Sequence, residues 1–383
     1  MTDNFLENIR VSEVPVENHP QYMDHESVYK ITEPDNNFIA FVGIHNTALG
    51  PGLGGIRYKS YANEAEALTD VLRLSEAMTW KNAAGGLDHG GGKSVIMAQK
   101  GQDRPSDVAL QIMAEGFNII NKNRTLYYGA EDMNISEYAL DKMLETTPYI
   151  KGASSDDPTV VSGNPSPLTA IGVFECMKVA VKHKLGRDSM DGVRVSLQGI
   201  GAVGATLAKL LHEDGAILSA TDTSSSAFEK LKAENVECDK VDLDEIYDVK
   251  ADVFAPNAIG GTLTDENIKR LKEAGVQIVC GAANNQQADQ IGGSQSRLMH
   301  KLGILYCPDY IVNAAGVIWV AKVGENAEQI TKELREGVPK RFAEILELAK
   351  QNPDRDLASI ASEYARKRVE DADNNNDRHT RTA

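Results

Sequence analysis

A glycine motif in the second half of the chain has the spacing of a dinucleotide-binding turn. It reads Gly199-Ile200-Gly201-Ala202-Val203-Gly204 and lies directly between the β-forming run RVSLQ and a helical pattern that extends to HEDG. In such turns the first glycine permits the bend, the second lets backbone approach a pyrophosphate, and the third lets helix and strand pack closely. Free N–H groups at the helix start favour the phosphates. Residues 199–204 are therefore predicted to bind a hydride-transfer cofactor.

An acidic residue after the next predicted strand supports the same cofactor. Asp222 follows the run ILSAT, about 20 residues beyond the glycines, where a carboxylate accepts hydrogen bonds from the adenosine ribose. Thr223 and three serines come next, with no basic residue before Lys230 to hold a ribose 2′-phosphate. NAD is therefore predicted rather than NADP.

Two lysines in the first half of the chain lie among glycines, Lys81 in MTWKNAAGG and Lys93 in GGGKS. Desolvation in a cleft beside another cation lowers the pKa of a lysine, which suits it to act as a general base. The GGGKS segment resembles the end of a P-loop, but that motif needs a glycine at position 87, and the chain has Leu87. Acid–base chemistry is predicted instead. A solvated surface lysine remains the alternative for Lys81.

Composition and charge exclude several classes of partner. The 383 residues include 40 basic and 56 acidic side chains, a net charge of −16, which repels nucleic acid and anionic membranes. The acidity is consistent with a solubility role or with adaptation to salt. No apolar run is long enough for a signal or a membrane span, so a cytoplasmic protein is expected. The 4 cysteines and 8 histidines lack metal-ligand spacing, and no metal is predicted.

The elements that must position the two lysines form a mixed α/β pattern over residues 1–150. Strands are predicted at residues 38–45 and 94–98. A helix between them begins at Asn63, with Glu66 completing a capping-box arrangement, and leads to Lys81. A second helix is predicted over residues 107–122.

Strands and helices alternate regularly after a loop rich in Ser, Asp, Pro and Gly at residues 152–167. The β-forming runs are RVSLQ, ILSATD, ADVFAP, VQIVC and ILYCPDY. This alternation predicts a second α/β domain over residues 151–322 with a doubly wound parallel sheet. Helices over residues 323–370, including one at 327–350, are expected to pack back on the first domain. The polar tail at residues 371–383 is expected to be disordered.

A series of motifs in this order closely resembles the leucine/phenylalanine/valine dehydrogenases of the glutamate dehydrogenase superfamily, with the pattern nearest to leucine dehydrogenase. The resemblance runs from about Phe38 to Val320 and implies a Rossmann NAD-binding domain after a substrate-binding domain. Its motifs are LGPGLGG, MTWKNAAGG, GGGKSVI, GAEDMNIS, SGNPSPLTA, LQGIGAVG, GAANNQ and CPDYIVNAAGVI.

The resemblance implies roles for three charged residues in a reversible oxidative deamination that yields a 2-oxo acid and ammonia. Lys81 would hold the substrate carboxylate, and Lys93 would activate the water that attacks the imine carbon. Asp132 would assist proton transfer and orient the amino group. Family members are homo-oligomers assembled through the first domain, so the same assembly is implied here.

The resemblance also implies which residues contact the cofactor beyond the glycine turn. Thr169, Asn285 and Asn313 occupy positions that family members place at the nicotinamide half, with loop capping as the alternative role for each. Asn257 and Ala258 are placed beside the cofactor, although position 257 is often a cysteine in relatives.

The implied side-chain pocket favours an apolar substrate. Leu53 stands where glutamate dehydrogenases place a lysine, and a leucine cannot pair a buried carboxylate. The remaining pocket residues implied are Gly54, Gly55, Met78, Val317 and Val320. Small branched walls suit leucine, isoleucine or valine. Trp319, where relatives usually have a polar residue, and the departing pair Asp88-His89 leave phenylalanine and tryptophan open.

Alternatives from other functional classes are a catalytically silent NAD-binding regulator, a structural or interaction protein, and a lyase that uses Lys93 as a Schiff-base amine. The regulator needs none of Lys81, Lys93 and Asp132, although all three are present. A structural protein has no use for the converging glycines, which cost stability.

Overall fold

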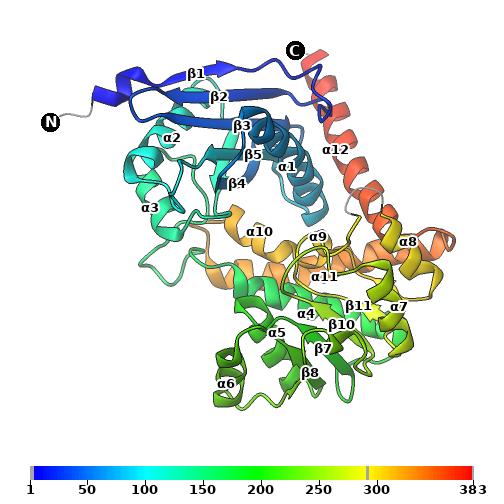
Figure 1. The fold of residues 1–383 in the computed structure, drawn as a ribbon. Helices are drawn as coiled ribbons and strands as arrows, with labels where there is room; N and C mark the ends of the chain where they lie inside the picture. Colours follow the sequence, from blue (N-terminus) through cyan, green and yellow to red (C-terminus); the bar gives the residue numbers. More distant parts are fainter. Residues whose placement is uncertain (1–3, 290–292, 382–383) are drawn as a thin grey trace. The chain divides into compact units, whose positions relative to one another are not determined.

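The chain forms two compact units (Figure 1). The computed structural model describes residues 4–289 and 293–381. The first unit contains the chain up to Gly163, Trp319–Ala327 and the part from Ala365 on, and the second contains Asn164–Ile318 and Glu328–Tyr364. The first unit thus ends later than the predicted boundary at residue 150. The reason is that the intervening loop is hydrogen-bonded to this unit, for example from Lys151 N to Gly129 O at 2.8 Å.

A six-stranded mixed sheet forms the centre of the first unit, in the order β1-β2-β3-β5-β4-β6. The pairs β1-β2, β2-β3 and β3-β5 are antiparallel, whereas β4 is parallel to both β5 and β6. The helices are η1 (Asn4–Asn8), α1 (Glu64–Gly85), α2 (Asp107–Ile120) and α3 (Glu137–Leu144). The strands are β1 (Arg10–Glu13), β2 (Ser27–Glu33), β3 (Phe38–Asn46), β4 (Gly52–Lys59), β5 (Gly90–Met97) and β6 (Tyr127–Ala130).

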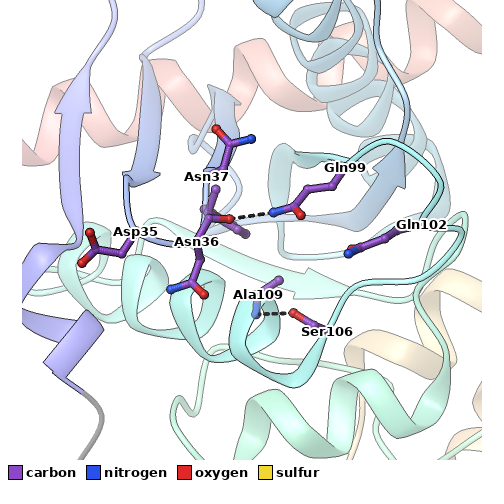
Figure 2. A pocket seen from close by; sticks show the side chains of 8 residues that line it. Asp35, Asn36, Asn37, Gln99, Gln102, Ser106 and Ala109 are labelled. Atoms are coloured by element: carbon purple, nitrogen blue, oxygen red, sulfur yellow. Dashed lines mark hydrogen bonds between the residues drawn. The ribbon is translucent and has the colours of Figure 1, made fainter.

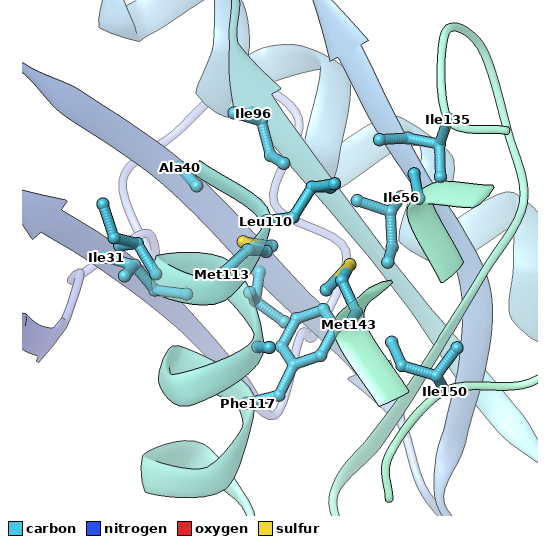
Figure 3. Packing of buried hydrophobic residues seen from close by; sticks show 14 of the residues in the cluster. Ile31, Ala40, Ile56, Ile96, Leu110, Met113, Phe117, Ile135, Met143 and Ile150 are labelled. Atoms are coloured by element: carbon cyan, nitrogen blue, oxygen red, sulfur yellow. The ribbon is translucent and has the colours of Figure 1, made fainter. Parts of the chain in front are cut away.

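Opposite faces of this sheet pack against different helices because side chains alternate along each strand. Helix α1 packs Val71 and Leu72 against Phe41 and Val95. The other face packs against α2 and α3 in the cluster that Figure 3 shows, which includes Ile31, Ile56, Ile96, Leu110, Met113, Phe117, Met143 and Ile150. The sheet is therefore buried on both sides.

The glycine-rich segments form strands that the sequence did not predict. Strand β4 includes Gly54 and Gly55, and β5 begins at Gly90 rather than at residue 94. Glycine is depleted in strands, so propensity argues against this assignment. Close packing requires it here: a Cβ on Gly54 would lie 1.8 Å from Gly92 O, and one on Gly91 would lie 1.9 Å from Thr79 Oγ1.

The start of α1 confirms the predicted cap. Asn63 Oδ1 accepts a hydrogen bond from Glu66 N at 3.0 Å, and Glu66 Oε2 accepts one from Ala62 N at 2.8 Å. The helix ends at Gly86, which has a φ of 77° and donates its N–H to Ala83 O and Asn82 O. Both ends of the helix that carries Lys81 are thus defined by local hydrogen bonds.

A buried histidine fastens α1 to the chain around residue 23. His45 donates from Nε2 to Met23 O at 2.8 Å and accepts at Nδ1 from Thr79 Oγ1 at 2.7 Å. Its ring lies 4.8 Å from that of His25. Burial is the main cause that lowers the pKa of His45 from 6.5 to about 4, and the charge of the neighbouring His25 is the second.

We expect this histidine to make the fold sensitive to acid. Between these two pKa values the unfolded chain binds a proton that the folded chain does not, so stability falls as pH decreases, by about 2 kcal/mol at about pH 5. Urea unfolding near neutral pH and near pH 5 measures the change. His45→Gln should reduce this pH dependence, and the exposed-site control His300→Gln should retain it. An undiminished dependence in His45→Gln would contradict the prediction.

The second unit contains a parallel sheet in the order β12-β11-β10-β7-β8-β9, which confirms the predicted doubly wound fold. The strands are β7 (Arg194–Gln198), β8 (Ile217–Thr221), β9 (Asp239–Lys240), β10 (Val253–Pro256), β11 (Ile278–Val279) and β12 (Leu305–Tyr306). The connecting elements are α4 (Ser166–Leu185), α5 (Ala202–Glu213), α6 (Ser225–Ala233), η2 (Glu245–Tyr247), α7 (Asp265–Glu273), α8 (Ser294–Lys301), α9 (Asp309–Val312) and α10 (Ala314–Ala321). The last residues of α10, from Trp319 on, belong to the first unit.

The C-terminal helices depart from expectation. Helix α11 (Ala327–Gln351) belongs to the second unit from Glu328 on, not to the first. Helix α12 (Leu357–Arg381) joins the first unit only from Ala365. It continues as a helix over residues 371–381, where disorder was predicted. Helical hydrogen bonds are local, so a helix can extend past its last buried turn. The end of that predicted tail, residues 382–383, lies outside the described residues.

Candidate active site

The two residues predicted to share acid–base work are in direct contact. Lys93 lies in β5, and Asp132 lies just after β6. Because β5 and β6 flank β4, their side chains can meet over it, and Lys93 Nζ lies 2.6 Å from Asp132 Oδ2. Lys93 is only 5% exposed. The structure therefore forms an ion pair from two distant motifs, in which the lysine is buried and the aspartate side chain is 25% exposed.

Gly55 of β4 provides the space for this pair. A Cβ at position 55 would lie 2.6 Å from Asp132 Cβ and 2.9 Å from Lys93 Nζ. Both distances are too short for any larger residue without displacement. Glycine is unfavourable in strands, but at position 55 it leaves the space in which Lys93 and Asp132 meet.

Burial and charge shift both pKa values in this pair. Burial lowers the pKa of Lys93 more than the attraction of Asp132 raises it, and the positive charge of Arg57 lowers it further. Burial would raise the pKa of Asp132, but Lys93 and Arg57 together hold it below its usual value. The pair therefore combines an ionised carboxylate with an amine that loses its proton more readily than a surface lysine.

Arg57 is a site residue that the sequence analysis missed. Its Nε lies 3.1 Å from Asp132 Oδ2, and its Nη1 lies 3.1 Å from Asp70 Oδ2 of α1. Alternation along a strand could have identified it, because Arg57 follows Gly55 by two residues and so shares its face. That inference required β4 to be recognised as a strand.

The residues implied for the substrate pocket in the first unit lie at the same glycine strands. Leu53, which is 1% exposed, precedes Gly54 in β4. A Cβ on Gly54 would lie 3.3 Å from Met78 Cγ of α1. Lys81 lies three residues after Met78, on the same side of α1. A shared substrate pocket for these residues stays a prediction.

The two valines implied for that pocket fall in different units. Val317 of α10 belongs to the second unit, whereas Val320 belongs to the first, where its Cγ1 would lie 3.3 Å from a Cβ on Gly152. Trp319 is 7% exposed, and its Nε1 donates to Ser162 O at 3.1 Å. This indole therefore has a structural contact that accounts for its presence. A pocket role for the valines stays a prediction.

Asp88, one of the residues that depart from the family pattern, also has a structural partner. It accepts from Arg368 Nη2 of α12 at 2.8 Å, while Arg368 Nη1 donates to Leu87 O at 2.6 Å. Arg368 thus caps the chain just beyond α1. His89 makes a different contact: its Nδ1 lies 3.1 Å from Pro51 O.

The glycine turn in the second unit has the geometry of a dinucleotide site. Gly199 has a φ of +95°, and a Cβ there would lie 2.8 Å from Ala258 Cβ. A Cβ on Gly204 would lie 2.1 Å from Gly199 O, so helix α5 and strand β7 need glycine to pack closely. A Cβ on Gly201 would meet no described atom within 4 Å. That open side, before Ala202 and Val203 begin α5, leaves room for a pyrophosphate.

Asp222 holds this turn against the following loop. Its Oδ2 accepts from Ile200 N at 2.8 Å, and its Oδ1 accepts from Ser224 N at 2.8 Å. Thr223 lies between these contacts in an exposed position. The carboxylate is thus fixed at the end of β8, where a ribose hydroxyl would be recognised.

The other predicted cofactor residues follow the carboxyl ends of β10, β11 and β12 in the same sheet. Asn257 Oδ1 accepts from Ala282 N at 2.9 Å, next to Ala258. Asn285 has a φ of 54°. Asn313 donates to Ala282 O and Asn284 Oδ1, but its buried Oδ1 has no partner among the described residues. An unpaired buried acceptor is costly, so Asn313 can receive an N–H from a ligand.

Thr169 of α4 lies against Gly316 of α10. Its Oγ1 donates to Pro165 O at 3.0 Å. A Cβ on Gly316 would lie 2.3 Å from Thr169 Oγ1. Thr169 thus has a contact within the first turn of α4, and its role at the nicotinamide half of the cofactor stays a prediction.

A polar pocket elsewhere in the first unit contains none of the predicted site residues (Figure 2). It lies beside the turn between β2 and β3, where Gln99 Nε2 donates to Asn36 O at 2.6 Å. Its lining consists of Asp35, Asn36, Asn37, Phe38, Gln99, Gln102, Ser106 and Ala109.

The part of the chain that the structure describes contains neither a metal-ligand cluster nor a helix that could span a membrane. No cluster of three or more His, Cys, Asp or Glu side chains there could hold a metal ion. Over the same residues, no helix combines the length and apolarity needed to span a membrane.

Comparisons with known proteins agree with the geometry of both units. Residues 25–149 match the family model "Glu/Leu/Phe/Val dehydrogenase, dimerisation domain", and residues 164–230 and 218–376 match "Glutamate/Leucine/Phenylalanine/Valine dehydrogenase". The chain is 39% identical over 331 residues to leucine dehydrogenase of Bacillus subtilis, covering 86% of this chain and 87% of the relative.

A tryptophan enzyme is similar over more of the chain. L-tryptophan dehydrogenase of Nostoc punctiforme is 34% identical over 363 residues, covering 93% of this chain and 95% of the relative. The crystal structure of that enzyme superposes with a TM-score of 0.78 at 31% identity, covering 92% of this chain and 97% of that one. With two motif-bearing units and matches to both family models, the chain belongs to the Glu/Leu/Phe/Val dehydrogenase family.

Proposed function

We propose that this chain is an NAD-dependent dehydrogenase that converts an apolar L-amino acid to its 2-oxo acid and ammonia, reversibly. Oxidative deamination is the activity of the leucine, phenylalanine and tryptophan dehydrogenases to which it is similar. The observation that carries the proposal is the contact of 2.6 Å between the buried Lys93 Nζ and Asp132 Oδ2. A silent NAD-binding regulator has no need of a buried amine with a lowered pKa.

This pair provides the acid and base for the hydrolytic half of the reaction. NAD, held by the turn at residues 199–204 and by Asp222, would supply the acceptor for the hydride that leaves the substrate Cα. Neutral Lys93 then takes a proton from water as the water oxygen attacks the imine carbon. Asp132 passes the proton that Lys93 has taken up to the amino nitrogen, and neutral Lys93 then accepts the hydroxyl proton as the C–N bond breaks, the carbonyl forms and ammonia leaves. Lys81 holds the substrate carboxylate as a point charge.

The cofactor preference follows from charge at the glycine turn. Asp222 is held by two backbone N–H groups at the place where the adenosine ribose would bind. A 2′-phosphate there would meet a carboxylate, and residues 223–229 contain no lysine or arginine. This supports NAD over NADP.

The side-chain pocket supports an apolar substrate of branched-chain size. Leu53 leaves no cation for a glutamate side chain, and burying that carboxylate unpaired would be prohibitive. One methylene changes discrimination by only about 1–3 kcal/mol, so leucine, isoleucine and valine should all react. L-tryptophan or L-phenylalanine is the second candidate, favoured by the extended similarity to the Nostoc punctiforme enzyme.

The two units divide the work in this proposal. The first unit binds the substrate and forms a homo-oligomer, supported by its match to a dimerisation domain. The second binds NAD. No nucleic-acid partner is proposed for a chain with a net charge of −16. A cytoplasmic location stays a prediction of the sequence.

We expect the purified chain to reduce NAD in the presence of leucine, isoleucine or valine, and NADP much more slowly. The measurement is nicotinamide absorbance with each proteinogenic L-amino acid and with both cofactors. Faster turnover of tryptophan or phenylalanine would show that the substrate is aromatic, and the proposed reaction would still stand. No reduction with any amino acid would reject the dehydrogenase and favour the regulator.

A further inference from the structure

We propose that Arg57 is a positioning residue for the reaction: held by Asp70 of α1, its guanidinium orients the Asp132 carboxylate that pairs with Lys93. The inference rests on the proposed dehydrogenase function and adds to it a residue outside the motifs that resemble the family. It concerns how helix α1 and strand β4 control the reacting groups.

The contacts form a continuous chain from α1 to Lys93. Asp70 Oδ2 accepts from Tyr61 OH at 2.7 Å and from Arg57 Nη1 at 3.1 Å. Arg57 Nε then donates to Asp132 Oδ2 at 3.1 Å, the same oxygen that Lys93 Nζ contacts at 2.6 Å. The side chains of Arg57 and Asp70 are 18% and 19% exposed. This shielding makes the ion pairs stronger than surface pairs.

The planar guanidinium explains why an arginine occupies this position. Its Nε and Nη1 point in fixed, different directions, so one side chain can bridge Asp132 and Asp70. A lysine has a single charged atom and cannot hold both carboxylates in a planar fork. With two cations on one oxygen, Asp132 is restrained from rotating away from Lys93.

Arg57 also contributes to the electrostatic state of the pair. The groups around Lys93 are Asp132 after β6, Arg57 of β4 and Asp70 of α1, with Tyr127 of β6 buried nearby and Glu131 beside Asp132. Arg57 lowers the pKa of Lys93 by like charge and that of Asp132 by opposite charge. Removing it should raise both pKa values.

The test compares Arg57→Met, Arg57→Lys and Asp70→Asn in the full-length chain. Arg57→Met should lower kcat about 10- to 100-fold, because a small misplacement of a catalytic group has effects of this size. The rise of kcat/KM with pH should move roughly one pH unit to higher pH. Arg57→Lys should recover the pH profile in part, and Asp70→Asn should give a smaller loss of kcat. KM for NAD should not change.

Arg194→Met is the matched control, because it also removes an arginine paired with an aspartate. Arg194 Nη2 lies 2.6 Å from Asp252 Oδ1 in the second unit, away from Lys93 in the sequence and in a separate unit. Both variants are expected to lose some stability. Only Arg57→Met should shift the pH profile. A stable Arg57→Met chain with unchanged kcat and pH profile would overturn the inference.

A second readout separates this inference from the proposed function. The pKa of Lys93 can be followed by nuclear magnetic resonance of its Nζ, assigned by comparison with Lys93→Ala. If the unsubstituted chain oxidises no amino acid, the proposed function fails, but Arg57→Met must still raise the Lys93 pKa. An unchanged Lys93 pKa would overturn the role of Arg57 whatever the activity.

Discussion

Replacing Lys93 by methionine should lower kcat/KM for amino-acid oxidation by about 1000-fold, within the range for loss of a general acid–base group. The change removes the amine that accepts the water proton and keeps much of the apolar stem. The amino-acid KM should change little, since Lys81 rather than Lys93 holds the carboxylate. Steady-state kinetics with NAD and the preferred amino acid measures the effect.

The variant should fold because Asp132 keeps a cationic partner. Its Oδ2 remains 3.1 Å from Arg57 Nε, so no unpaired buried carboxylate results. The exposed-site control is Lys209→Met, which removes a lysine paired with Glu234 at 3.1 Å in the second unit. Lys93→Arg should also be nearly inactive, since a guanidinium does not deprotonate. Activity within about tenfold of the unsubstituted enzyme in Lys93→Met would remove Lys93 from the mechanism.

The same lysine distinguishes dehydrogenation from lyase chemistry. A lyase would form a Schiff base between Lys93 and a carbonyl substrate, and borohydride would then trap a covalent adduct on this residue. In the proposed reaction the imine forms on the substrate nitrogen instead. Borohydride with 2-oxo acid should therefore leave the mass of the chain unchanged.

Motifs with a local geometric reason could be predicted from the sequence. Gly199, Gly201 and Gly204 each meet a distinct requirement of one turn, and Asp222 closes the next strand. The cap at Asn63 is equally local. In such cases a few neighbouring residues determine the structure, and no distant contact is needed to recognise it.

Elements determined by distant contacts could not be predicted in this way. Gly54 and Gly55 lie in a strand because Gly92, Lys93 and Asp132 approach them from other parts of the chain. Because β4 was not predicted as a strand, Arg57 could not be assigned to the same strand face as Gly55 and was not recognised as a site residue. The same reasoning applies to α11, because its apolar stripe shows that one side is buried but not which unit buries it.

Gly55→Ala should lower kcat/KM about 100-fold by displacing the catalytic pair, although it adds a single methyl group. The new Cβ would lie 2.6 Å from Asp132 Cβ, 2.9 Å from Glu131 O and 2.9 Å from Lys93 Nζ. The backbone oxygen cannot retreat without moving the loop after β6. The lysine can swing away, but that would break its contact with Asp132. Either response separates the base from the carboxylate.

The matched control is Gly337→Ala in helix α11, where a Cβ would approach no described atom closer than 3.9 Å. Alanine is favoured over glycine inside a helix by roughly 0.5–1 kcal/mol, so this variant should be slightly more stable and fully active. Gly55→Ala should lose activity more than stability, as measured by kinetics and thermal unfolding on the same preparation. If both variants were equally active, Gly55 would not be needed to place Lys93 against Asp132, and close packing between β4 and its neighbours would remain its only role.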